Sequence, residues 1–251
     1  MTLLYRAIFR VDFDQCFELA DKPGTIIQTI LDQSKDYWEI VGPTNNHYQI
    51  NAARKLAAAR NRSAENFAVD TNAISGNFEM DEGVPLDSFI GGPYLNVCND
   101  ALSAIVERFG IKNINRIGVR LFMTGGVVTD SVQNRKKVAA RFKELAVPGD
   151  ITANVADVAL VLVGGFDHDT EFRLHCGPGA DTDVAQFLQQ PIAERTENTM
   201  HHKFSADIDI YQQKINFKGT NLLKWIKAKE PYIKDLLAMA DKSAGGSGDN
   251  A

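Results

Sequence analysis

Two carboxylates and two guanidinium groups stand at strand-like spacing in this chain of 251 residues. Asp207 and Asp209 alternate with isoleucines, and Arg116 and Arg120 flank the run Ile-Gly-Val. Since the side chains of a strand alternate between its two faces, the members of each pair point to the same side. Two carboxylates at this spacing can hold a divalent cation, as they do in the Asp-x-Asp strand of nucleotidyltransferases. Guanidinium groups on one face can bind an anion.

A structural interpretation explains the same four residues without any ligand. A partly enclosed arginine needs a counter-charge, and an aspartate on a neighbouring strand supplies one. The glycine pairs Gly125-Gly126 and Gly164-Gly165 lie too far from Asp207 for the glycine turn that precedes a nucleotidyltransferase Asp-x-Asp strand. We therefore favour ion pairs between the two aspartates and the two arginines. A metal-dependent enzyme that acts on nucleotides or phosphate esters is the alternative.

The other ligand-type residues do not form a recognisable catalytic or metal set. Neighbouring strand residues point to opposite faces, which argues against convergence of the polar group around residues 167–176. This group consists of Asp167, His168, Asp169, His175 and Cys176. The three cysteines, Cys16, Cys98 and Cys176, lack paired spacing, so we expect them to be reduced. We expect neither a metal nor a cofactor.

The N-terminal segment repeats the arginine pattern of the middle of the chain. Residues Leu4–Phe13 alternate between apolar and polar, and Arg6 and Arg10 share the polar face. A helix pattern follows each arginine-bearing strand, and Phe67–Ile74 resembles Phe204–Tyr211. Together these matches predict a tandem duplication, with pseudo-repeats at residues 1–110 and 111–242. The glycine- and serine-rich residues 243–251 are expected to form a flexible tail.

Hydrophobic periodicity predicts the elements that position these side chains. The strongest helix spans Tyr94–Phe109, with one apolar stripe and Gly110 at its end. Other helices are expected over Pro23–Lys35, Ala52–Asn66, from Asp130 to Pro148, near 184–189, and over Asn221–Ala240. Strands are expected over Leu4–Phe13, Tyr37–Val41, Tyr48–Asn51, Phe67–Met80 with a turn at Ser75-Gly76, Arg116–Met123, Val155–Val163, Thr170–Cys176 and Phe204–Tyr211.

The order of these elements predicts an α+β protein. Each pseudo-repeat reads strand, helix, strands, helix, and the two combine into one curved antiparallel sheet or partial barrel flanked by long helices. The polar sheet faces should then form a shared cleft. The residues expected to face one another there are Arg6, Arg10, Arg116, Arg120, Asp70, Asp207 and Asp209.

The second half of the chain also resembles a known family. The run Arg116-Ile-Gly-Val-Arg120 after a long amphipathic helix, followed by Asp207-Ile-Asp209-Ile-Tyr211 and a C-terminal helix, is similar to a sporadically distributed bacterial family of uncharacterised proteins of about this size. The similarity covers most of the second half and the helix before it. It implies no catalytic residue.

Composition narrows the classes of function. The formal net charge of -5 argues against general nucleic-acid binding, because phosphate contacts require a surplus of lysine and arginine. No apolar run reaches the roughly 20 residues of a membrane span, so we expect a cytoplasmic protein without membrane contact. The leading hypothesis is a non-catalytic binding or regulatory module for a small anionic ligand or a protein partner. A structural assembly subunit is a further alternative, and the oligomeric state stays open.

Overall fold

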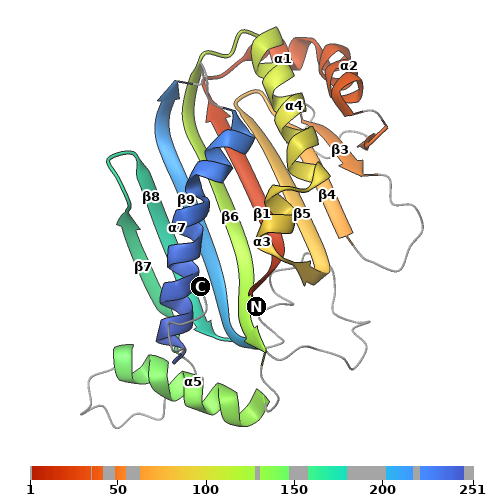
Figure 1. Cartoon of the computed structure of the whole chain (residues 1–251). Coiled ribbons are helices and arrows are strands. Elements are labelled where there is room, and N and C mark those ends of the chain that lie inside the picture. Colours follow the sequence, from red (N-terminus) through yellow and green to blue (C-terminus); the bar gives the residue numbers. More distant parts are fainter. Residues whose placement is uncertain are drawn as a thin grey trace.

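The protein is built on one nine-stranded antiparallel sheet, seen in the computed structural model of residues 2–34, 36–41, 49–54, 63–127, 131–146, 158–179, 202–216 and 221–245 (Figure 1). Its strands are β1 (Thr2–Phe13), β2 (Trp38–Val41), β3 (Ile50–Arg54), β4 (Ser63–Val69), β5 (Ala73–Val84), β6 (Asn113–Val127), β7 (Leu160–Gly165), β8 (Thr170–Pro178) and β9 (His202–Asn216). They follow the order β2-β3-β4-β5-β1-β6-β9-β8-β7. The sheet is open, with β2 and β7 at its edges, so the expected antiparallel sheet is present and is not a closed barrel.

Helices cover one face of this sheet. The helices are α1 (Phe17–Asp21), α2 (Pro23–Ser34), α3 (Leu86–Ile90), α4 (Pro93–Arg108), α5 (Ser131–Ala146) and α7 (Leu222–Ser243). Figure 1 shows α3, α4 and α7 across one face, α2 beside α4, and α5 below the ends of β8 and β9. We call the face under α3, α4 and α7 the inner face and the opposite one the outer face.

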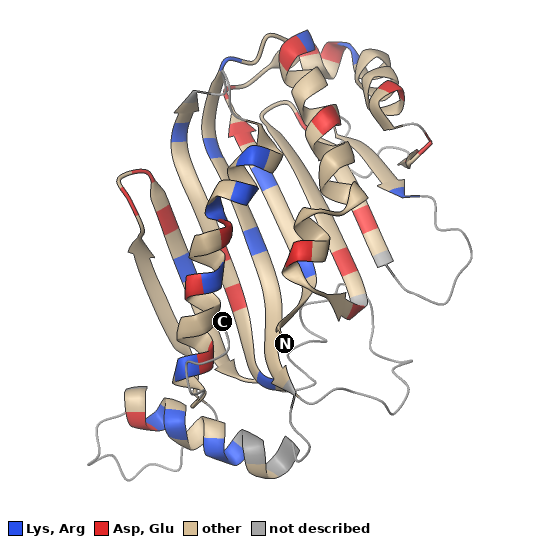
Figure 2. Cartoon of the chain, viewed as in Figure 1, with Lys and Arg blue, Asp and Glu red and all other residues tan. Residues whose placement is uncertain are grey.

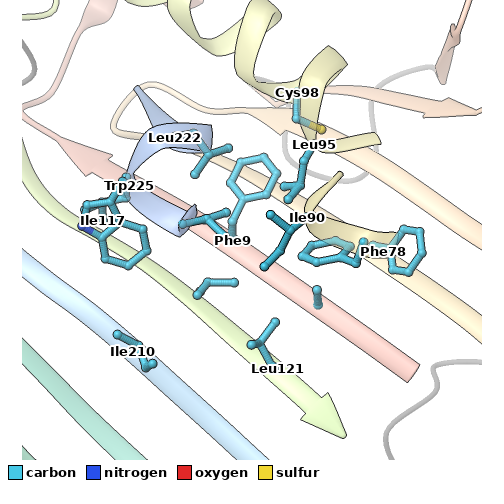
Figure 3. Packing of buried hydrophobic residues seen from close by; sticks show 14 of the residues in the cluster. Phe9, Phe78, Ile90, Leu95, Cys98, Ile117, Leu121, Ile210, Leu222 and Trp225 are labelled. Carbon is cyan, nitrogen blue, oxygen red and sulfur yellow. The ribbon is translucent and has the colours of Figure 1, made fainter. Parts of the chain in front are cut away.

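The period-two pattern of the central strands decides which side chains meet the helices. In β1, Phe9 and Val11 are buried on the inner face, and Arg10 between them is exposed on the outer face. Figure 3 shows Phe9 of β1 and Leu121 of β6 among the apolar side chains between the sheet and the helices, with Leu222 of α7 and Leu95 of α4 close to Phe9. Burial of these apolar side chains is the main force that holds the helices on the sheet.

Helices α4 and α7 confirm the helical predictions most fully. The predicted stripe of α4 is buried, including Cys98, which therefore packs in the core. Gly110 follows the helix with a φ of 61°, a left-handed conformation that glycine adopts without strain. The side chain of Asn221 caps α7 by accepting a hydrogen bond from the backbone N–H of Lys224. Pro231 lies inside α7, and the helix continues past it to Ser243.

Two predictions for the first half are wrong. The turn placed at Ser75-Gly76 lies earlier, between β4 and β5, and Gly76 stands within β5. Gly76 is glycine for another reason: an added Cβ would lie 2.2 Å from Cε1 of Phe9 and 2.4 Å from the hydroxyl of Tyr94. The helix proposed over Ala52–Asn66 is also contradicted, because β3 and β4 occupy both of its ends.

The two halves of the chain meet in the middle of the sheet. Residues 1–110 contribute β2-β3-β4-β5-β1, residues 111–242 contribute β6-β9-β8-β7, and β1 pairs with β6. In each half the first strand lies centrally and the last strand lies beside it. The expected match of Phe67–Ile74 with Phe204–Tyr211 is wrong in detail, because the former spans the β4–β5 turn and the latter lies within β9. The predicted helix near 184–189 and residues 246–251 lie outside the described residues.

Candidate functional site

The outer face of β6, β9 and β8 carries rows of charged side chains. In the register of these strands, Arg120 stands beside Asp209, and Asp209 stands beside Arg173. Two residues further along β6, Phe122 stands beside Asp207 of β9, and Asp207 stands beside His175 of β8. Figure 2 shows blue and red bands interspersed along the central strands. We call Arg116, Arg120 and Arg173 the arginine cluster.

Arg120 and Asp207 form the best-defined ion pair of this face. Nε of Arg120 donates to Oδ1 of Asp207 at 2.8 Å, and Nη2 donates to Oδ2 at 2.6 Å. This two-point contact raises the pKa of Arg120, because the hydrogen bonds to Asp207 favour the charged form. The guanidinium of Arg120 also lies over the ring of Phe122, 4.8 Å from its centroid. Arg120 is thus held from two sides.

Arg116 is positioned by an aromatic ring and by a looser ion pair. Its guanidinium lies 4.5 Å from the centroid of the Tyr211 ring, and its Nη2 donates to Oδ2 of Asp209 at 3.4 Å. The hydroxyl of Tyr211 donates to the carboxylate of Glu171 at 2.6 Å, and this bond raises the pKa of Tyr211. Tyr211 is therefore a fixed platform for Arg116. The sequence predicted ion pairs between these two arginines and the two aspartates, and the structure pairs Arg116 with Asp209 and Arg120 with Asp207.

Asp209 occupies the centre of the arginine cluster. Burial raises the pKa of its carboxyl group, and the nearby charges of Arg116, Arg120 and Arg173 oppose this rise only in part. Three guanidinium groups thus surround a carboxylate that is costly to keep charged. Sequence analysis did not single out Arg173, although alternation along the predicted strand Thr170–Cys176 assigns it a face.

Arg6 lies on the same outer face but in another environment. Its Nε donates to Oδ1 of Asn77 at 2.8 Å and lies 3.1 Å from Oε1 of Glu79. Burial lowers the pKa of Arg6, Glu79 raises it in part, and the positive charge of Arg120 lowers it further. Arg6 and Arg120 both lie within reach of the Phe122 ring, at 5.6 and 4.8 Å from its centroid. These contacts give Arg6 a structural role.

Two residues that were expected to face Asp207 and Asp209 have other partners. Arg10 pairs with Asp12 of its own strand, through an Nε to Oδ1 distance of 2.6 Å, and is exposed. Asp70 lies at the β4–β5 turn, where its Oδ1 accepts from the backbone N–H of Thr71. A local turn bond thus replaces the contact across the sheet that was expected of Asp70.

The residues of the β7–β8 hairpin that could bind a metal have structural roles in the loop and in β8. Oδ1 of Asp167 accepts hydrogen bonds from the backbone N–H groups of Asp169 and Thr170, which lower the pKa of Asp167 to about 2. His175 is exposed on the outer face, whereas Cys176 is buried on the inner face. Within the described ranges, no three or more His, Cys, Asp or Glu side chains gather as metal ligands would.

Comparisons with known proteins do not place the chain in a family. No family model matches the sequence, and no curated protein matches it. The crystal structure of the AdoMetDC-delta26 monomer of Trypanosoma brucei is similar at 8% identity and a TM-score of 0.31, over 84% of this chain and 66% of that one. A similarity this low carries no argument about fold or function. The resemblance to the sporadically distributed bacterial family stays a prediction. In the described part of the chain no helix is long and apolar enough to span a bilayer.

Proposed function

We propose that the protein is a non-catalytic binding module that recognises a small anionic ligand through the arginine cluster. The observation that carries this proposal is the central position of Asp209 among Arg116, Arg120 and Arg173. A carboxylate or phosphate group of a ligand can bind the exposed sides of these guanidinium groups through charge-assisted hydrogen bonds, since Arg116 is 37% exposed and Arg120 is 50% exposed.

Preorganisation favours such binding. The ring of Tyr211 holds Arg116, and the ring of Phe122 together with Asp207 holds Arg120. Less side-chain entropy is then lost when a ligand binds, because the guanidinium groups already have fixed orientations. Arginine is suited to this role because its planar donors match two oxygens of one carboxylate or phosphate group.

Asp209 couples this binding to pH. A ligand anion beside Asp209 repels its carboxylate, and burial already favours the protonated form. Binding therefore takes up a proton, and affinity should rise as the pH falls towards the pKa of Asp209. Protonated Asp209 would also donate a hydrogen bond to the ligand.

Internal duplication belongs to the same proposal. Phe9 stands opposite Val119 in the β1–β6 register. A two-fold axis between these residues relates Arg6 to Arg116, because each lies three residues before its central residue. The same axis relates Arg6's partner Asn77 in β5 to Tyr211 in β9, the ring under Arg116. The two halves then share one arrangement of strands. In the second half, the pair of Arg116 and Tyr211 has become part of a ligand site.

The test is ligand-induced thermal stabilisation with defined anions. Pyrophosphate and succinate are each titrated into the full chain, with sodium chloride at matched ionic strength as the screening control. We expect a concentration-dependent rise in Tm with at least one of the two anions.

Matched variants locate the effect. Arg116→Met and Arg173→Met should abolish the rise in Tm, whereas Arg10→Met should keep it, because Arg10 is an exposed arginine on the same face with its own partner Asp12. Circular dichroism confirms that each variant is folded. The same rise in all three variants, or no rise with either anion in the parent chain, would reject the proposal.

A further inference from the structure

In the part of the chain that the structure describes, one edge strand of the sheet has none of the features that block pairing with another strand. Within the described residues β7 pairs with β8 alone, and Figure 1 shows it at the rim of the sheet. Its sequence, Leu-Val-Leu-Val-Gly-Gly, contains no charge and no proline, the features that block strand addition at edges. The other edge, β2, has only four residues and carries Glu39. The two edges therefore differ in how readily they accept another strand.

Exposed valines follow the unprotected edge. Val161 is 51% exposed and Val163 is 73% exposed, the latter the highest exposure among the large hydrophobic side chains of the described residues. Both lie on the outer face, beside His175 and Arg173 of β8. Leu160 and Leu162 lie on the inner face, where they pack against the edge of the core. The edge is thus apolar on both of its faces.

We propose that β7 is the interface of a homodimer, in which it pairs with β7 of a second copy in antiparallel orientation. In this pairing the two-fold axis passes between Leu162 of one copy and Leu162 of the other. Each Val161 then faces Val163 of the other copy, and the four exposed valines form one apolar cluster. Leu160 faces Gly164 in the same register, and no charged side chain of β7 enters the seam.

Symmetry limits the assembly to two copies. An antiparallel pairing of one edge with itself uses that edge in both copies and leaves none for a third. The opposite edge, β2, is too different in sequence and length to replace it. A strand pair of this length covers less than the ~1,200 Å² of a typical stable interface, so we expect a dimer that dissociates on dilution, with a Kd near the micromolar range.

Sedimentation velocity of the full chain over a range of concentrations tests the interface. We expect a monomer–dimer equilibrium, and Val163→Lys should raise its Kd by about tenfold or more. The matched control is Val41→Lys, which puts the same charge at an exposed valine of the other edge strand and should change the Kd by less than about twofold. A monomer at all concentrations, or a Kd that Val163→Lys leaves unchanged, would overturn the proposal.

Cysteine cross-linking tests the register of the two strands. In a Cys16→Ser background, which removes the partly exposed native thiol, Leu162→Cys places two cysteines opposite each other at the axis. Mild oxidation should give a covalent dimer. Val163→Cys faces Val161 of the other copy and should give far less. Equal cross-linking at both positions, or cross-linking at 163 alone, would reject this register.

Discussion

The ion pair between Arg120 and Asp207 is expected to be energetically coupled, unlike most pairs at a protein surface. Asp207 has only 18% of its side chain exposed, and two hydrogen bonds of 2.8 and 2.6 Å fix the guanidinium to it. The ring of Phe122 lies under the same guanidinium. The substitutions Arg120→Met and Asp207→Ala, alone and combined, form a double-mutant cycle that isolates the interaction between the two side chains.

The structure sets the expected magnitude of the coupling. Exposed pairs contribute about 0.2–1 kcal/mol, and hydrogen bonds to charged groups contribute about 1.5–3 kcal/mol. Arg120 is half exposed, which places this pair between the two ranges, at a coupling of about 1–2 kcal/mol. Arg120→Met alone should cost about 2 kcal/mol, because it also leaves the carboxylate of Asp207 without its partner.

Urea denaturation measures the free energy of unfolding of all four proteins. The control is the pair of Arg10 with Asp12, where the arginine is 54% exposed and its partner stands on the same strand. Its cycle should give a coupling of about 0–0.5 kcal/mol. A coupling of the two pairs that agrees within error would refute the idea that burial and stacking strengthen the pair of Arg120 and Asp207.

Three further predictions concern stability. Gly76→Ala should lower the free energy of unfolding by about 1–3 kcal/mol, because its Cβ collides with Phe9 and Tyr94; unchanged urea unfolding would contradict the packing argument. Asp209→Asn should raise Tm at pH 7, because the raised pKa of Asp209 means that its charged carboxylate destabilises the fold. The difference in Tm between the variant and the parent chain should vanish at low pH, where Asp209 is protonated. A lower Tm of the variant at pH 7 would contradict the prediction. The pKa of Asp167, lowered to about 2, means that its stabilisation is present above its unfolded pKa of about 3.9 and is lost as the pH falls towards 2; in Asp167→Asn that part of the acid dependence of Tm should disappear, and an identical acid profile would contradict it.

The local sequence determined the faces of the central strands and the main helices. Alternation put Arg6 and Arg10 on one side of β1 and Asp207 and Asp209 on one side of β9, because the side-chain period of a strand is two wherever the strand lies. The stripe of α4 followed from the helical period in the same way. These properties depend on neighbours in the chain, so the sequence alone is sufficient to predict them.

Tertiary structure decided which of these faces meet and in what register. The position of Arg173 beside Asp209 and the place of Gly76 within β5 depend on contacts between residues far apart in the sequence. Arg10 and Asp70 instead have partners close to them in the chain, Asp12 and Thr71. Strand order is set by how the whole chain buries its apolar faces, and a shift of register changes every cross-strand partner. For the same reason the position of β7 at an edge depends on β9 and β8 lying between it and β6.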